Sequence, residues 1–242
     1  MILLREDFKY PSKTEIDTIS NEIPRVDILG FIYTSKTKAF FSGIPNEEVK
    51  RIDHLFWWDH CLANRLGRLR QTFEYLLVHH MRGITELNNP KSPKEAANTL
   101  LLDYYSDVFY YFYFSSLDII AQILNVYFRL KIEEDKVDFT RIKNKKTPVK
   151  DLLDFFYKFN EPSRNLRNTF THRFSPTMGD FRAKTVMGED DQNILGFGTK
   201  KQVALDTIVC NIKNAMKMLS TLLDELRNYL KSDIENNAYL FE

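Results

Sequence analysis

The chain has 242 residues, of which 43% are hydrophobic and 28% charged, and its net charge is +1. This composition is typical of a soluble globular protein and excludes a globally disordered chain. Its two cysteines, Cys61 and Cys210, form no Cys-x-x-Cys pair, so we predict two buried thiols rather than a disulfide or thiolate zinc site. Residues 1–10 are charged where a signal peptide needs an apolar run, so we expect a cytoplasmic protein.

Residues 1–45 are predicted to form an N-terminal appendage, and residues 46–242 the main helical domain. Ser12 and Glu15 have the spacing of a capping box, which predicts a short helix up to Ile23. Two β-prone runs within 28–41 flank a turn and allow a small hairpin.

A long helix is predicted from Asn46 to about Thr85, because its apolar residues keep helical spacing. His80 lies on the same stripe and is expected to be a hydrogen-bonded core histidine. Trp57 and Trp58 are expected to pack in the protein rather than to stack on bases. The apolar stripe consists of Leu62, Leu66, Leu69, Phe73, Leu76 or Leu77, and Ile84.

A second long helix is predicted to start at Ser92, since Pro93 suits a first turn and Glu95 completes a capping box. It is apolar on almost every side up to Leu130, so we expect both its own bundle and a partner subunit to cover it. Four polar residues interrupt any apolar run long enough to cross a membrane: Asp103, Asp107, Asp118 and Gln122.

The remaining segments predict a lysine-rich linker over 133–147, a helix after Pro148, and a loop or second hairpin over 174–199. Thr199 and Gln202 have the spacing of a capping box before a last helix. The fold class is therefore mainly α: a bundle of four or five helices, some long, with small β-hairpin additions. The residues expected to face inward are Leu152, Leu153, Phe155, Phe156 and Phe159 in the first of these helices, and Leu205, Ile208, Ile212, Ala215, Leu219, Leu222 or Leu223, Leu226 and Tyr229 in the last.

Residues 160–174 predict a short helix with two different faces. Asn160 is a candidate cap, Pro162 suits the first turn, and the buried stripe comprises Leu166, Phe170 and Phe174. The opposite side carries Arg164, Arg167, Asn168 and Thr171, with His172 about 40° around the helix from Asn168. A cation, an amide and a group that titrates near neutrality thus share a face that the core does not need.

The same helix lies in the basic part of the chain. Residues 136–184 contain 12 lysines and arginines against 5 acidic residues, a balance of +7, whereas the segments on either side each carry −3. Such a segment is commonly a solvated face, but this one would also attract phosphate to the position of Arg167 and His172.

Other chemistries have less support. Paired Glu-x-x-His ligands are absent, and His54 and His60 fall on different helix faces, so a metal site is disfavoured. Neither common glycine-rich phosphate loop occurs. A Ser-His-Asp triad stays open, because nothing indicates a particular serine.

The segment from Arg167 to His172 is Arg-x4-His with an asparagine directly after the arginine, which resembles the signature of the HEPN superfamily (higher eukaryotes and prokaryotes nucleotide-binding). The resemblance implies a helical homodimer in which two motifs line one cleft, and often a metal-independent endoribonuclease. It gives Arg167 and His172 as the catalytic pair, and Asn168 as the adjacent polar group. No cofactor is implied.

RNA or its phosphates are expected to contact Arg164, Arg173, Lys145 and Lys146. On an ideal helix Arg167 and His172 point about 140° apart, so the site needs a distorted turn or a second subunit, and we expect the latter. An antitoxin or other regulatory protein is a further possible partner, in a toxin–antitoxin or defence role, and no membrane is expected.

Two alternatives to the ribonuclease are a non-catalytic module that binds RNA, nucleotides or a protein, and a metalloenzyme built in the bundle. Whether Ser116 and Asp118, on the second long helix, contribute to the site stays open.

Overall fold

The computed structural model describes residues 2–31, 45–84, 91–172, 175–177, 183–187, 193–197 and 202–232; for His172 and the two strands it describes the backbone only. The described part is mainly helical, which confirms the predicted fold class. The α-helices are α1 (Lys13–Ile19), α3 (Asn46–Met81), α4 (Pro93–Tyr127), α5 (Phe139–Lys143), α6 (Lys150–Phe159), α7 (Glu161–His172) and α8 (Leu205–Ser232). Short 3₁₀ turns occupy Arg5–Asp7, Ser20–Glu22 and Glu134–Lys136.

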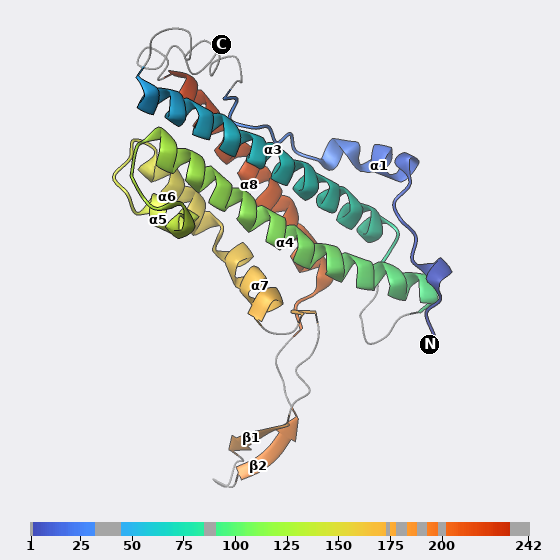
Figure 1. Cartoon of the computed structure of the whole chain (residues 1–242). Helices are drawn as coiled ribbons and strands as arrows, with labels where there is room; N and C mark the ends of the chain where they lie inside the picture. Colours follow the sequence, from blue (N-terminus) through green and yellow to red (C-terminus); the bar gives the residue numbers. More distant parts are fainter. Residues whose placement is uncertain are drawn as a thin grey trace.

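The long helices α3 and α4 lie side by side, α8 packs against the same bundle, and α7 lies beside α4 (Figure 1). Their apolar stripes meet in one core that contains Leu62, Phe73, Phe109, Ile120 and Leu219. This agrees with the predicted seams, because residues three or four apart share one face of a helix.

The N-terminal helix α1 starts as predicted. The Ser12 hydroxyl accepts the Glu15 N–H, and the Glu15 carboxylate accepts the Ser12 N–H at 2.8 Å, so the capping box is confirmed. The helix itself ends at Ile19, and the 3₁₀ turn follows it directly.

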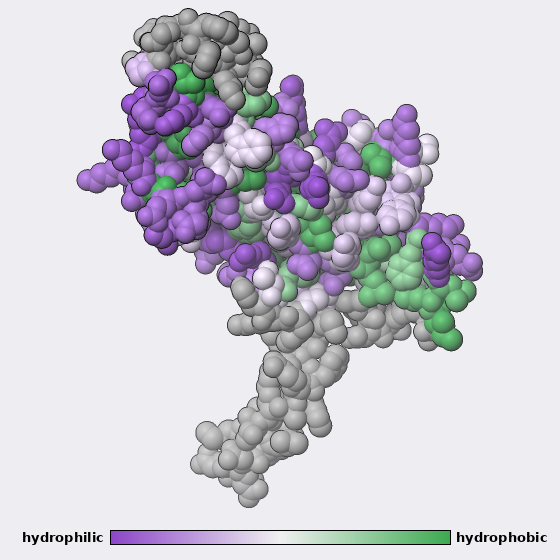
Figure 2. Space-filling model, viewed as in Figure 1, coloured by the Kyte–Doolittle hydropathy of each residue, from purple (hydrophilic) through white to green (hydrophobic). Residues whose placement is uncertain are grey.

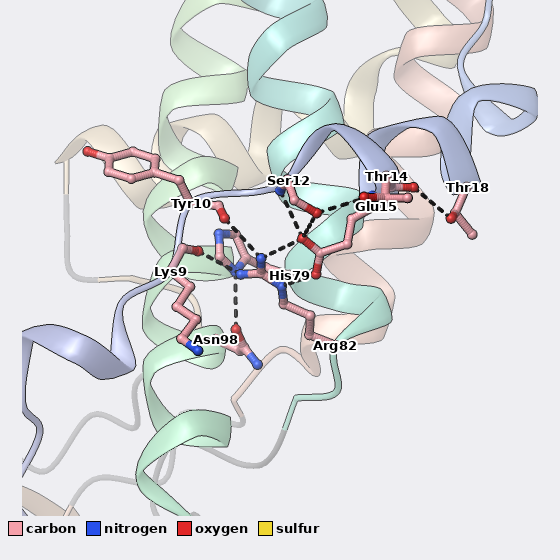
Figure 3. Close-up of polar contacts among 9 residues, drawn as sticks. All are labelled: Lys9, Tyr10, Ser12, Thr14, Glu15, Thr18, His79, Arg82 and Asn98. Carbon is pink, nitrogen blue, oxygen red and sulfur yellow. Dashed lines mark hydrogen bonds and ion pairs between the residues drawn. The ribbon is translucent and has the colours of Figure 1, made fainter.

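Arg82, which follows α3, clamps this N-terminal segment to the bundle (Figure 3). Its Nε and Nη2 donate to the two Glu15 carboxylate oxygens at 2.7 and 2.8 Å. The same guanidinium donates to the backbone oxygens of Lys9 at 2.6 Å and Tyr10 at 3.0 Å. Hydrogen bonds from Arg82 and Ser12 lower the pKa of Glu15 to about 2.

We expect acid to loosen this clamp. Because the pKa of Glu15 is lower in the folded protein than its ordinary 4.5, its stabilising effect is present above about pH 4.5 and is lost as the pH falls toward 2. NMR chemical shifts of α1 should report the change, and Arg82→Ala should loosen α1 at every pH. An α1 that stays docked in Arg82→Ala at pH 6 would contradict the clamp; Arg68→Ala, elsewhere on α3, is the control.

A second anchor holds the segment before α3. The buried Asp59 carboxylate accepts N–H groups from Leu29 at 2.9 Å, Gly30 at 2.8 Å and Phe31 at 2.9 Å. Gly30 has a φ of +96°, which other residues adopt only with strain, so glycine allows the three N–H groups to converge. The two flanking side chains, Leu29 and Phe31, enter the core.

The histidines at the end of α3 differ from the prediction. His80 is partly exposed and its Nε2 lies 2.8 Å from Asp206 Oδ1, whereas the neighbouring His79 is fully buried. His79 Nδ1 lies 3.2 Å from Asn98 Oδ1, and its ring stacks on Tyr105. Burial lowers the pKa of His79, which keeps the ring neutral. The prediction of a core histidine was therefore wrong by one residue.

Two expectations about buried side chains are wrong. Trp58 packs against the core, but Trp57 is 58% exposed and lines a hollow between α3 and α4. Cys61 is half-buried, and Cys210 is exposed on the outer side of α8.

The predicted linker after α4 contains structure of its own. Asp138 caps α5 by accepting the Arg141 N–H at 2.8 Å, and α5 buries Phe139 and Ile142. The last predicted helix is confirmed, since α8 buries most of its predicted stripe.

In α6 the inward face is narrower than predicted. Leu153 and Phe156 are buried, but Phe155 and Phe159 are exposed, because residues four apart form a second stripe on the outer side.

A two-stranded antiparallel hairpin lies within the predicted loop or hairpin at 174–199. Its strands are β1 (Ala183–Met187) and β2 (Asn193–Phe197), with Ala183 opposite Phe197, and the hairpin lies away from the bundle (Figure 1). Most of the predicted N-terminal hairpin, the Thr199 cap and Phe174 fall outside the described residues. The two domain boundaries remain predictions.

Candidate active site

The motif helix α7 is fixed at its start by buried polar contacts. The Asn160 Oδ1 accepts the Tyr113 hydroxyl at 3.1 Å, so this side chain joins α7 to α4. The Asn211 Oδ1 on α8 accepts the Tyr110 hydroxyl at 2.7 Å and the Ser163 hydroxyl at 3.0 Å. Burial raises the pKa of both tyrosines, which therefore stay neutral donors. The helices α4 and α8 thus set the direction of α7.

A further contact holds the chain shortly after α7. The Asp103 carboxylate on α4 accepts the Ser175 hydroxyl at 2.6 Å and the Thr177 hydroxyl at 2.8 Å. Thr177 is buried. Both sides of the motif are therefore tied to α4.

One pocket, of about 210 Å³, opens beside the motif, between α4, α5, α6 and α7. It combines aromatic, amide and oppositely charged side chains, as a site for a small polar ligand does. Its lining is Phe114, Leu117 and Asp118 from α4, Asp138, Phe139 and Thr140 from the start of α5, Tyr157 from α6, and Asn160, Arg164, Arg167 and Asn168 at α7.

Arg167 is a cation of this pocket whose guanidinium makes only one hydrogen bond to the described residues. Its guanidinium lies 5.8 Å from the centre of the Phe114 ring, and Nη1 donates a long 3.4 Å hydrogen bond to Asn168 Oδ1. Among the described residues no carboxylate forms a salt bridge with it. A half-buried guanidinium of this kind retains N–H donors for two oxygens of a phosphate.

Arg164 lines the same pocket but is otherwise engaged. Its guanidinium lies 3.7 Å from the centre of the Tyr157 ring, and Nη1 donates to the Tyr157 carbonyl oxygen. Lys143 lies 4.5 Å from the same ring. These contacts fix α7 against α6, and the expected contact of Arg164 with RNA remains a prediction.

Asp118 reaches solvent at the wall of the pocket, and it accepts the Phe139 N–H at 3.3 Å. The protein atoms crowded around it raise the pKa of its carboxyl above the ordinary value, and the Asp138 carboxylate raises it further. The Phe139 N–H and the Arg167 guanidinium act in the opposite direction. Ser116, the other open candidate, is buried and donates to the Phe112 carbonyl oxygen, so it does not reach the pocket.

The other predicted residues lie in different surroundings. Lys145 and Lys146 are exposed after α5 and do not line the pocket. His172 ends α7, and its side chain lies outside the described residues, as does Arg173.

Hydrophilic side chains cover the end of the molecule that holds α5 and α6, while apolar ones gather near the N-terminus (Figure 2).

A second hollow, of about 500 Å³, adjoins the first and shares Asp118 with it. It lies between α3 and α4 and includes the exposed Trp57 together with His60 and Arg65. The Arg65 guanidinium lies over the ring of Tyr111 at 5.8 Å.

Neither a metal centre nor a membrane segment emerges from the described residues. They contain no group of three or more potential protein ligands of a metal ion. None of the described helices combines the length and the apolar character that crossing a membrane requires.

The protein is a helical bundle in which a short helix brings an arginine and an asparagine to a pocket. A family model described as HEPN_Cthe2314-like HEPN matches residues 58–236, so the chain belongs to this HEPN family. The matched region includes α4, the pocket and the whole of α7. Comparisons with curated proteins and with solved structures found no match. Membership of the family supports a nuclease or RNA-binding function in general.

Proposed function

We propose that the protein is a metal-independent endoribonuclease whose site is completed across a homodimer. The observation that carries this proposal is the Arg167 guanidinium, which lines a pocket on the motif helix without a carboxylate partner among the described residues. Arg167 would hold the scissile phosphate, with Asn168 beside it, and His172 would transfer protons.

The reaction needs no ion in principle. The ribose 2′-oxygen loses its proton to a base and bonds to the adjacent phosphorus, while the bond from phosphorus to the 5′-oxygen breaks and that oxygen gains a proton. The products are a 2′,3′-cyclic phosphate and a 5′-hydroxyl. Imidazole carries out both transfers near neutral pH, and a guanidinium stabilises the negative charge that accumulates on the phosphate.

A second subunit would supply the second imidazole that the reaction needs. A single imidazole cannot readily be base and acid on opposite sides of one phosphorus atom. The helix α7 is α-helical from Glu161 to His172, so the Arg167 and His172 positions stay about 140° apart around it. This supports convergence across a twofold axis rather than through a distorted turn.

We place the dimer contact on the outer stripe of α4. Tyr104 and Tyr111 are 60% and 62% exposed, and with Leu100 and Asp107 they keep helical spacing along one side. Asp118 continues the stripe to the pocket. Two copies that meet through this stripe would therefore bring their pockets to one interface.

Tyr111→Asp is expected to convert the dimer to a monomer, because a charge would be buried against the partner subunit. Light scattering during gel filtration measures the mass, and RNA cleavage should fall at least about tenfold with it. Lys217→Asp, at an exposed position of α8, is the control. A Tyr111→Asp protein that remains dimeric would exclude this stripe as the interface.

The activity itself is tested by incubating RNA with the purified protein and a chelator. We expect cleavage by the wild-type protein and none by His172→Ala, with His54→Ala, an exposed histidine of α3, as the matched control. Cleavage products should end in a 2′,3′-cyclic phosphate. Unchanged cleavage by His172→Ala would overturn the proposed role of this histidine.

RNA binding without cleavage would favour the alternative, a non-catalytic RNA-, nucleotide- or protein-binding module. The exposed aromatic residues of α3 and α4 favour this alternative as far as a protein partner is concerned. A regulatory or antitoxin-like partner, and a role in defence, remain part of the proposal.

A further inference from the structure

We infer that Asp118 makes the pocket selective for ribonucleotides: on binding, it accepts a hydrogen bond from the ribose 2′-hydroxyl while Arg167 holds the adjacent phosphate, and the hydroxyl turns from Asp118 to the His172 imidazole before its proton is removed. The inference rests on the phosphate-binding role proposed for Arg167, and it adds a residue of α4, outside the motif, that recognises the sugar.

The position of Asp118 gives the first argument. It lies on α4 and Arg167 on α7, both line the one pocket, and no salt bridge joins them among the described residues. The contacts of Asn160 and Ser163 fix α7 to its neighbours, so the two charges are held apart by packed helices. A volume of about 210 Å³ accommodates on the order of ten water molecules, and hence a sugar and its phosphate.

Asp118 also has unused capacity as an acceptor. A carboxylate can accept about four hydrogen bonds, and the structure shows one, from the Phe139 N–H at 3.3 Å. Asp138, the other carboxylate of the pocket, is already engaged, because it caps α5 and its Oδ2 lies 3.5 Å from Arg141 Nε. Crowding by protein atoms raises the pKa of Asp118, and a more basic carboxylate accepts a hydroxyl proton more strongly.

The charge of Asp118 should make the pocket bind ribonucleotides more tightly than deoxyribonucleotides. A carboxylate beside a phosphate site repels the phosphate, so on its own Asp118 weakens the binding of every nucleotide. A 2′-hydroxyl offsets this repulsion, because it donates a charge-assisted hydrogen bond to the carboxylate. Deoxyribose offers no such donor, and the 2′-hydroxyl is the group by which a protein tells RNA from DNA.

The test compares two mononucleotides in which the phosphate is next to the 2′-position: adenosine 3′-monophosphate and 2′-deoxyadenosine 3′-monophosphate. Calorimetry should show that the wild-type protein binds the ribonucleotide about tenfold more tightly. Asp118→Ala should bring this ratio near one and should bind the deoxynucleotide more tightly than wild type does. Asp118→Asn should retain part of the preference through its amide oxygen.

The gain in deoxynucleotide affinity distinguishes recognition from a structural effect, because a distorted pocket would weaken both nucleotides. Glu225→Gln, which changes an exposed acid of α8, should leave both affinities unchanged. Equal binding of the two nucleotides by the wild-type protein would overturn the role of Asp118, and Arg167→Ala weakening both would leave the phosphate site standing. No binding of either nucleotide would overturn the phosphate role of Arg167 and this inference with it.

Discussion

Replacement of Arg167 by lysine is expected to slow RNA cleavage by about 100- to 1000-fold, the effect of removing one donor that stabilises charge in a transition state. Lysine keeps the positive charge but loses the planar fork that holds two phosphate oxygens at once. We do not expect Arg164 to take over the lost contacts, because its guanidinium is held against Tyr157 by the ring contact and by a hydrogen bond to the Tyr157 carbonyl oxygen. Single-turnover cleavage of a short RNA in the presence of chelator measures the chemical step.

The matched control for this substitution is Arg70→Lys, which changes an exposed arginine of α3 that pairs with Glu74. It should cleave at the wild-type rate. Since the Arg167 side chain is half-buried at a pocket wall, we expect the melting temperature of Arg167→Lys to stay close to that of the wild type. Wild-type cleavage by a folded Arg167→Lys protein would remove Arg167 from the catalytic site.

The helices could be predicted from the sequence where their signals are local. The Ser12 capping box and the Ser92 N-cap act within four residues, and both form. At Ser92 only the hydrogen bond from the Glu95 N–H forms, so the predicted capping box is incomplete. The core stripes of α3 and α8 depend only on helical spacing, and they also form.

Burial at the edge of a stripe depends on the neighbouring helices, which the sequence does not place. His79 and His80 lie about 100° apart on α3, and only the position of α4 decides that His79 meets Asn98 and Tyr105. Phe155 has a side chain typical of a core, yet α6 turns it outward. Phe139 and Ile142 lie within the predicted linker, and they are buried because they form one face of the short helix α5.

In the candidate site, too, the local part could be predicted from the sequence and the part that depends on helix packing could not. Arg167, Asn168 and His172 form one local motif, so they could be proposed from the sequence alone. Asp118 lies about fifty residues before them, and only the packing of α4 beside α7 brings it to the pocket. The sequence offered a weak signal for it: a charged residue that interrupts an otherwise apolar helix requires a polar environment.

Replacement of Asp59 by alanine is expected to lower the free energy of unfolding by about 3–5 kcal/mol, the largest stability effect that we expect of a single substitution here. Three backbone N–H groups, from Leu29, Gly30 and Phe31, would lose their common acceptor in the protein interior. An unpaired buried donor costs about 1–3 kcal/mol, and some of this cost is recovered as the segment relaxes toward water. For a chain of this size the melting temperature should fall by roughly 10 °C.

The substitution Asp59→Asn separates the shape of the side chain from its charge. The amide keeps one acceptor oxygen, but its NH₂ group would face N–H donors where the second carboxylate oxygen now accepts Gly30 and Phe31. We therefore expect a loss of stability close to that of alanine, whereas Glu225→Gln, at an exposed position of α8, should change stability by less than about 0.5 kcal/mol. If Asp59→Asn were as stable as the wild type, the converging N–H groups would not depend on the charge of Asp59. Gly30→Ala tests the same anchor from the other side, because an alanine at a φ of +96° is strained whatever the space around it.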